Sequence, residues 1–216
     1  MNIGEIIAEP LRTHYPKTPE SDVKERVKDV MNKVGLLDNL VNRYPHEFSG
    51  GQCQRIGIAR ALILKPKLII CDEPVSALDV SIQAQVVNLL MDLQEEMDLT
   101  LIFIAHDLSI VKHISTKIMV LYLGNMVELA NSNDIYTKPR HPYTQALISA
   151  VPIPDPSIEK SKKLILIEGD LPSPVDPPSG CVFRTRCQKA QDICAIEKPE
   201  FKEVSNNHEV ACHFHD

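Results

Sequence analysis

Apolar residues recur at steps of three and four along the first part of the chain, a spacing that predicts amphipathic helices. One helix is expected over Ile3–Leu11, where Pro10 limits it. A second is expected to begin at Thr18-Pro19 and to end near Gly35, which is a suitable C-cap residue. The apolar face of this second helix is formed by Val23, Val27, Val30, Met31 and Val34.

Farther along, short apolar runs alternate with helical patterns, which predicts the α/β fold class with a parallel sheet. Strands are expected over Leu68–Cys71, Thr100–Ala105, Ile118–Leu123 and Met126–Leu129, and the first of them is expected to be buried on both faces. The helices of this part are expected over Gln52–Leu64, Ile82–Met97 and Leu108–Ile114. Such sheets bind ligands at the carboxyl ends of their strands.

The last part of the chain has a different character. Seven of the sixteen prolines lie between Val151 and Ser179, so this stretch is expected to be linker-like, with a possible strand at Leu164–Ile167. Four of the six cysteines fall within the last 36 residues. In a cytosolic chain, a cysteine-dense tail indicates metal binding before it indicates disulfides.

Composition excludes several classes of function. The 216 residues are 44% hydrophobic and carry a net charge of −6, which argues against a mainly disordered chain and against a nucleic-acid partner. No apolar run approaches the roughly 18–20 residues that a membrane-spanning helix needs. The N-terminus lacks the features of a secretory signal, so a cytosolic protein is expected, with any membrane contact made through a partner.

Polar residues at the ends of the predicted strands are the first candidates for chemistry. Asp72 and Glu73 follow one strand, and His106 follows the next. Adjacent parallel strands would place His106 near Glu73, where one carboxylate could hold Mg²⁺ and the other could polarise an attacking water. A solvated acidic loop and a histidine that caps a strand are the ordinary alternatives.

The segment Ser49, Gly50, Gly51 and Gln52 precedes a predicted helix. Glycines let a backbone approach a phosphate closely, and a helix N-terminus favours an anion. An ordinary glycine turn before a helix is the alternative for this segment taken alone.

The order of these motifs is more informative than each motif. FSGGQ, LIICDE, SALD (Ser76–Asp79) and an apolar run that ends at His106 follow one another within 59 residues. This arrangement resembles the ATP-binding subunits of ABC transporters. The matching parts are their signature motif, their Walker B motif with the catalytic glutamate, their D-loop and their switch histidine. The resemblance implies a P-loop NTPase core with a helical signature subdomain.

Further segments narrow the resemblance to oligopeptide/dipeptide importers, and within them to the second of the two ATP-binding subunits. These segments are HPYTQALISAVPIPDP, EGDLPSP, PPSGCVFRTRC and HEVACH. The likeness covers essentially the whole chain. It implies a helical subdomain at residues 1–66, the remaining nucleotide-binding core at 67–135 and a small cysteine-rich C-terminal domain at 136–216.

The resemblance also implies a role for each residue. Ser49, Gly50, Gly51 and Gln52 would contact the γ-phosphate of an ATP held mainly by a second ATP-binding subunit. Asp72 would assist Mg²⁺, Glu73 would be the general base, Asp79 would communicate across the dimer and His106 would sense the γ-phosphate. Two permease subunits and, indirectly, a peptide-binding protein would complete an importer. The chain would then lie peripherally on the cytoplasmic face of the membrane.

One family motif has no match. Walker A requires GxxxxGK followed by Ser or Thr, and none of the eight glycines precedes a lysine. The chain therefore resembles an N-terminally truncated subunit, for which we expect negligible ATP hydrolysis in isolation. The alternatives are an inactive remnant that acts as a metal-binding or interaction module and, less favoured, an ABC ATPase outside transport.

The four tail cysteines, Cys181, Cys187, Cys194 and Cys212, have the spacings CX5C, CX6C and CX17C. Four thiolates suit zinc or an iron–sulfur cluster, but structural zinc sites usually have closer pairs. The resembled subunits include members with a 4Fe–4S cluster at these positions, so the cluster is preferred to zinc and to free thiols. The nearby His208, His213 and His215 are expected to be surface histidines.

Overall fold

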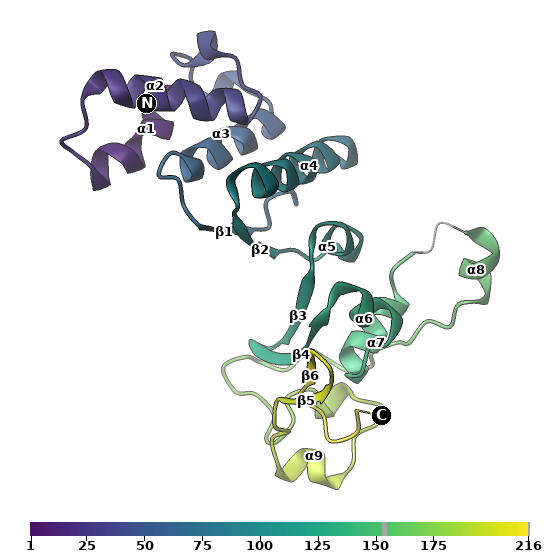
Figure 1. Cartoon of the computed structure of the whole chain (residues 1–216). Coiled ribbons are helices and arrows are strands. Elements are labelled where there is room, and N and C mark those ends of the chain that lie inside the picture. The colour runs from purple at the N-terminus through teal and green to yellow at the C-terminus, as the bar shows by residue number, and fades with distance from the viewer. Residues whose placement is uncertain (153–154, 216) are drawn as a thin grey trace. The chain divides into compact units, whose positions relative to one another are not determined.

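The computed structural model describes residues 1–152 and 155–215 (Figure 1). The chain divides into two compact units, with the division in the sequence between His106 and Asp107. The first unit opens with three packed helices: α1 (Ile3–His14), α2 (Glu20–Lys33) and α3 (Gly50–Leu62). Two 3-10 turns, Asp38–Leu40 and Pro45–Glu47, connect α2 to α3. The helix interfaces are filled by fully buried aliphatic side chains, among them Ile3, Ile7, Leu11, Met31 and Leu62.

Helix α1 is longer than the sequence predicts. It continues through Pro10 to His14, so the prediction that Pro10 limits the helix is wrong. Proline removes one backbone hydrogen bond, but the helix is fixed at its start by a capping box in which Asn2 and Glu5 exchange hydrogen bonds of 2.8 and 2.9 Å. Burial of its apolar stripe on both sides of Pro10 outweighs the lost bond.

A parallel pair of strands follows the helices. Strands β1 (Leu68–Asp72) and β2 (Thr100–Ile104) are joined by α4 (Val80–Met97), and their register sets Leu68 opposite Thr100 and Asp72 opposite Ile104. The predicted strand–helix–strand order and the parallel pairing are therefore confirmed. The carboxyl ends of the two strands lie side by side, which positions the residues that follow them.

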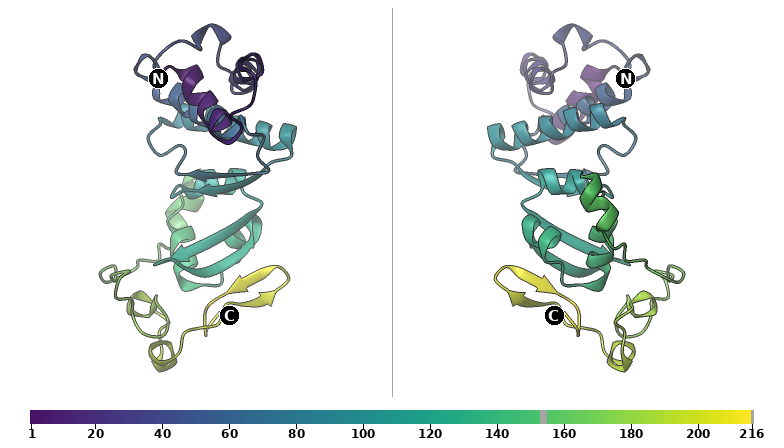
Figure 2. Two further views of the ribbon diagram at one scale, coloured as in Figure 1. Left: turned by 90° about the vertical axis from the view of Figure 1, so that its left-hand side faces the viewer. Right: turned by 90° about the vertical axis from the view of Figure 1, so that its right-hand side faces the viewer.

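The prediction that the first strand is buried on both faces is wrong. Cys71 faces the covered side, whereas Leu68, Ile70, Ile102 and Ile104 are 46–62% exposed. An apolar run shows that at least one face is buried but not how many elements cover it. The helices of the first unit lie on one side of this two-stranded ribbon (Figure 2).

The second unit contains a four-stranded antiparallel sheet of order β3-β4-β6-β5. Its strands are β3 (Lys117–Tyr122), β4 (Asn125–Asn131), β5 (Lys202–Ser205) and β6 (His208–Val210). The β5–β6 hairpin is the yellow ribbon in Figure 2. Helices of this unit are α5 (Leu108–Ile114), α6 (Ser132–Thr137), α7 (Pro142–Ser149), α8 (Pro156–Ser161) and α9 (Asp192–Ile196), with a 3-10 turn at Arg184–Arg186.

Two strand predictions are corrected here. The strand at Lys117–Tyr122 pairs antiparallel with β4 and does not extend the parallel sheet. Leu123 and Gly124 both have positive φ, +46° and +72°, and form the tight two-residue turn that imposes antiparallel pairing. The possible strand at Leu164–Ile167 does not form. In that segment Ile165 donates its N–H to the Ser149 hydroxyl, and Leu166 accepts from the Gln188 side chain.

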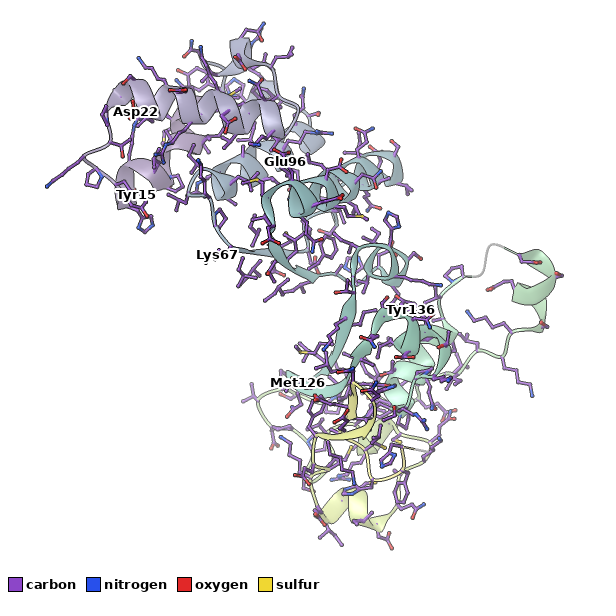
Figure 3. All side chains as sticks on the ribbon, in the orientation of Figure 1. Tyr15, Asp22, Lys67, Glu96, Met126 and Tyr136 are labelled. Carbon is purple, nitrogen blue, oxygen red and sulfur yellow. The ribbon has the colours of Figure 1, made fainter. Side chains whose placement is uncertain are left out.

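The second unit has its own small core. Tyr122, Val127 and Phe183 are buried together at its centre. Away from this core, but in the same unit, Tyr136 of α6 donates a hydrogen bond to the carbonyl of Leu108 at the start of α5. Tyr136 is labelled in Figure 3. Among the described helices of both units, none is long and apolar enough to cross a membrane.

Candidate functional site

The segment Ser49–Gln52 forms the N-terminal cap of α3. The Ser49 Oγ accepts a long hydrogen bond, 3.4 Å, from the Gln52 N–H, and the Gln52 side chain accepts from the Ser49 N–H at 3.0 Å. This capping box fixes the turn and leaves the helix N-terminus exposed at Gly50. The predicted helix therefore forms, but it begins at Gly50, two residues earlier than predicted.

Packing against α4 requires a glycine at position 51. A Cβ at Gly51 would lie 2.5 Å from the Ile82 Cγ2, and a Cβ at Gly50 would lie 3.3 Å from the Leu78 Cδ2. The glycines therefore let α3 approach the start of α4. Sequence reasoning missed this contact between the SGGQ and SALD segments, because no periodicity links them.

Asp79 is the N-cap of α4. Its Oδ1 accepts from the Ser81 hydroxyl at 2.7 Å and from the N–H groups of Ser81 and Ile82, each at 3.1 Å. The Ser81 hydroxyl, followed by the Ile82 N–H, lowers the pKa of Asp79. In this chain the carboxylate is therefore ionised and committed to holding the helix start beside the glycine turn.

Glu73 and His106 come together at the ends of β1 and β2. The Glu73 N–H donates to the Ile104 carbonyl at 2.9 Å, and the His106 Nδ1 lies 3.4 Å from the Glu73 Oε1. The predicted nearness of the two side chains is confirmed. Both are open to solvent, with side-chain exposures of 53% and 73%. In the described part of the chain, no hydrogen bond or ion pair joins them to Ser49–Gln52.

The backbone at Glu73 is unusual. Its φ is +45°, a left-handed conformation that costs free energy in a residue with a side chain. The Ser76 N–H and hydroxyl both donate to the Glu73 carbonyl, at 3.3 and 3.2 Å, and hold this bend. The strand therefore ends at Asp72, and the next carboxylate is turned out of the strand direction. Asp72 itself is exposed on the open face of β1.

The four tail cysteines share one neighbourhood in the second unit. Burial raises the pKa of the Cys181 and Cys187 thiols, and burial raises that of Cys212 to about 11, with smaller contributions from the other three thiols. The Cys181 N–H donates to the Cys194 carbonyl at 2.8 Å. Within the described residues, however, no three His, Cys, Asp or Glu side chains form a group that could hold a metal ion.

A buried polar network lies beside this group, and sequence reasoning missed it. Glu128 is 0% exposed, and its carboxylate accepts from the N–H groups of Arg140 and His141 at 2.7 and 2.9 Å. The His208 Nε2 lies 2.6 Å from the Glu128 Oε1, and His208 is 3% exposed. The prediction that His208 is a surface histidine is therefore wrong. A carboxylate within the apolar run Met126–Leu129 was the available signal.

His141, the first residue of the HPYT segment, has a structural role. It is the N-cap of α7: its Nδ1 accepts from the Tyr143 N–H at 3.1 Å, and Pro142 occupies the first helical position. Burial lowers the pKa of His141 to about 4, although the charge of Glu128 opposes the shift. The ring is therefore neutral at pH 7, as an acceptor must be.

We expect the second unit to lose stability in mild acid because of His141. The unfolded chain binds a proton near pH 6.5 and the folded one only near pH 4, so stability falls as the pH drops through this window, by about 3 kcal/mol in total. The His141→Asn variant keeps a capping side chain without a titratable ring. Urea unfolding of the full chain, followed by hydrogen exchange of α7, should show a weaker pH dependence in this variant. Equal dependence in both proteins would contradict the assignment.

Comparison with known proteins adds five findings. The family model described as "ABC transporter" matches residues 4–76, and the one described as "Oligopeptide/dipeptide transporter, C-terminal region" matches residues 127–194. The oligopeptide transport ATP-binding protein OppF of Haemophilus influenzae is 68% identical over 98% of this chain and 64% of its own length. Its counterpart in Salmonella typhimurium is 69% identical, over 98% and 63%.

The solved structure of cbiO1 from Clostridium perfringens, part of the ABC transporter complex cbiONQ, is also similar. It has a TM-score of 0.57 at 26% identity and covers 63% of this chain and 53% of its own. The mixed α/β architecture thus has neighbours among the ABC ATPases. The chain spans just under two thirds of the length of the two OppF relatives.

Proposed function

The chain belongs to the family of ATP-binding proteins of oligopeptide/dipeptide ABC transporters, and on this premise we propose that it helps to couple ATP hydrolysis to peptide import. The observation that carries the proposal is the meeting of Glu73 and His106 at the ends of two parallel strands. ABC ATPases bind ATP with Mg²⁺, so these are the implied substrate and ion.

The exposed carboxylates suit that chemistry. Asp72 would hold Mg²⁺, directly or through water, and the ion would neutralise charge on the phosphates. Glu73 would accept the proton of a water that attacks the γ-phosphorus while the bond to ADP breaks. His106, hydrogen-bonded to Glu73, would orient that carboxylate and contact the γ-phosphate.

The glycine turn would act on a nucleotide held by another subunit. The N-terminus of α3 is exposed at Gly50 and carries the positive end of the helix dipole, and Ser49 adds a hydroxyl. We propose that Ser49–Gln52 contact the γ-phosphate across a dimer of ATP-binding subunits, and that Asp79 keeps α4 in register with this turn.

The proposed partners follow from the function. They are a second ATP-binding subunit, two permease subunits and, indirectly, a peptide-binding protein, with this chain on the cytoplasmic face of the membrane. The test is affinity purification of the native protein from solubilised membranes of its source cells. Recovery of these partners, with peptide-stimulated ATP hydrolysis, is expected. A monomer without membrane partners or hydrolysis would favour the alternative, a non-catalytic interaction module.

We also propose that Cys181, Cys187, Cys194 and Cys212 bind a 4Fe–4S cluster of structural role. The nearness of the four thiols supports this, although binding requires them to converge further than they do here. Protein purified without oxygen should be brown and contain four irons per chain, and Cys187→Ser should lose the colour. Cys53→Ser and Cys71→Ser are the matched controls. A colourless protein with one zinc, or with no metal, would contradict the proposal.

A further inference from the structure

The cysteine-bearing part of the second unit is built from two segments that are distant in sequence. One is the loop that carries Cys181 and Cys187, and the other is the β5–β6 hairpin, after which Cys212 follows. Specific contacts must hold the loop and the hairpin together. The buried network around Glu128 contacts both of them.

The hairpin is attached through β4. Glu128 stands opposite Val210 in the antiparallel ladder, and the Ala211 N–H donates to the Val127 carbonyl at 2.9 Å. The β4–β6 ladder is short, with two residue pairs. A 2.6 Å contact between the His208 imidazole and the Glu128 carboxylate adds to it. Cys212 lies two residues beyond the last strand residue, so its position depends on how firmly β6 is held.

The loop is attached through aromatic packing. Phe183 is 2% exposed, and its ring centroid lies 5.0 Å from that of Tyr122, 5.4 Å from Tyr143 and 5.6 Å from His141. Cys181 and Cys187 pack against the same cluster. Two of the four rings, His141 and Tyr143, belong to the HPYT segment.

Glu128 joins the two attachments. One carboxylate oxygen accepts from the Arg140 N–H and contacts His208, and the other accepts from the His141 N–H. A buried carboxylate with all these partners in place has one favourable position, because any shift leaves a charged oxygen unpaired.

We propose that Glu128 and the HPYT segment form a positioning device that sets the hairpin carrying Cys212 against the loop carrying Cys181 and Cys187. The HPYT segment is then a structural element that brings the four thiols into one neighbourhood and makes no contact with nucleotide. Glu128 and the HPYT segment would hold the two segments together whether or not a metal cluster binds.

The test measures how fast each thiol of the full chain reacts with N-ethylmaleimide, after treatment with reductant and chelator. His208→Ala should raise the rate at Cys212 about tenfold, which corresponds to an opening free energy lowered by about 1.4 kcal/mol. His208→Gln, whose amide can still donate to Glu128, should retain most of the protection. Phe183→Leu should raise the rates at Cys181 and Cys187 and leave Cys212 slow.

Glu128→Gln is the decisive variant. An amide offers one acceptor oxygen, so its NH₂ group must face a backbone N–H or the imidazole, and we expect faster labelling at Cys181, Cys187 and Cys212 together. Cys71, buried in the first unit, and exposed Cys53 are internal controls and should not change. Faster labelling at Cys212 alone, or no change at any of the three, would overturn the proposal. If Glu128→Gln unfolds the unit, the separate responses to His208→Ala and Phe183→Leu still decide it.

Discussion

On the proposed function, replacing Glu73 with glutamine is expected to reduce ATP hydrolysis by the proposed transporter about 10²–10⁴-fold, the usual contribution of a general base. Glutamine has the same shape and cannot accept the proton of the attacking water. The side chain is 53% exposed, and its one hydrogen bond within the described residues is with His106, so its neutralisation should leave the fold unchanged. The measurement is phosphate release under saturating Mg·ATP.

The matched control is Glu95→Gln, which removes the same charge from an exposed position on α4. It should retain wild-type hydrolysis. Nucleotide binding by Glu73→Gln should also persist, because Asp72 is untouched. A variant that hydrolyses ATP at more than a tenth of the wild-type rate would show that another group is the base.

The position of this glutamate illustrates what sequence reasoning can reach. The apolar runs and the helix between them predicted a parallel strand pair, and parallel pairing brings both strand ends to one edge. The nearness of Glu73 and His106 followed from that rule alone. The left-handed backbone at Glu73 could not be foreseen, because it depends on the hydrogen bonds from Ser76 that hold the bend.

Other features depend on contacts between segments without a shared pattern. The approach of Gly51 to Ile82 is set by helix packing, and a glycine before a helix indicates only a turn. His208 resembled a surface histidine because its partner, Glu128, lies 80 positions earlier. The number of buried faces of β1 could not be predicted either, because an apolar run has the same sequence whether one or two layers cover the strand.

The arrangement of the four tail cysteines was only partly predictable from the sequence, for a related reason. Cysteine spacing predicted that the four thiols are metal ligands. They share a neighbourhood, but among the described residues no group that could hold a metal ion is formed. Their final separation is fixed by the surrounding backbone, which the spacing does not describe. Within that backbone, Gly180 has little room for a side chain.

Gly180→Ala is accordingly expected to be among the most destabilising substitutions in the second unit. The φ of Gly180 is +64°, and an added Cβ would lie 2.4 Å from the Cys194 carbonyl oxygen and 2.9 Å from the Ala195 carbonyl carbon. These are backbone atoms, so relief requires the Cys181–Cys194 hydrogen bond to break. We expect a loss of about 3–5 kcal/mol, the sum of left-handed strain and a displaced backbone.

Gly124→Ala separates these two costs. Gly124 has a φ of +72°, but nothing lies within 4 Å of a Cβ placed there, so its variant should lose only about 1–2 kcal/mol. Urea unfolding of the full chain, with hydrogen exchange read separately over residues 107–152 and 180–196, gives both values. If the two alanine variants were equally stable, the contact between Gly180 and Cys194 would not fix the loop. A larger loss at Gly180, confined to residues 180–196, would identify this backbone contact as the element that holds Cys181 beside Cys194 whether or not a metal binds there.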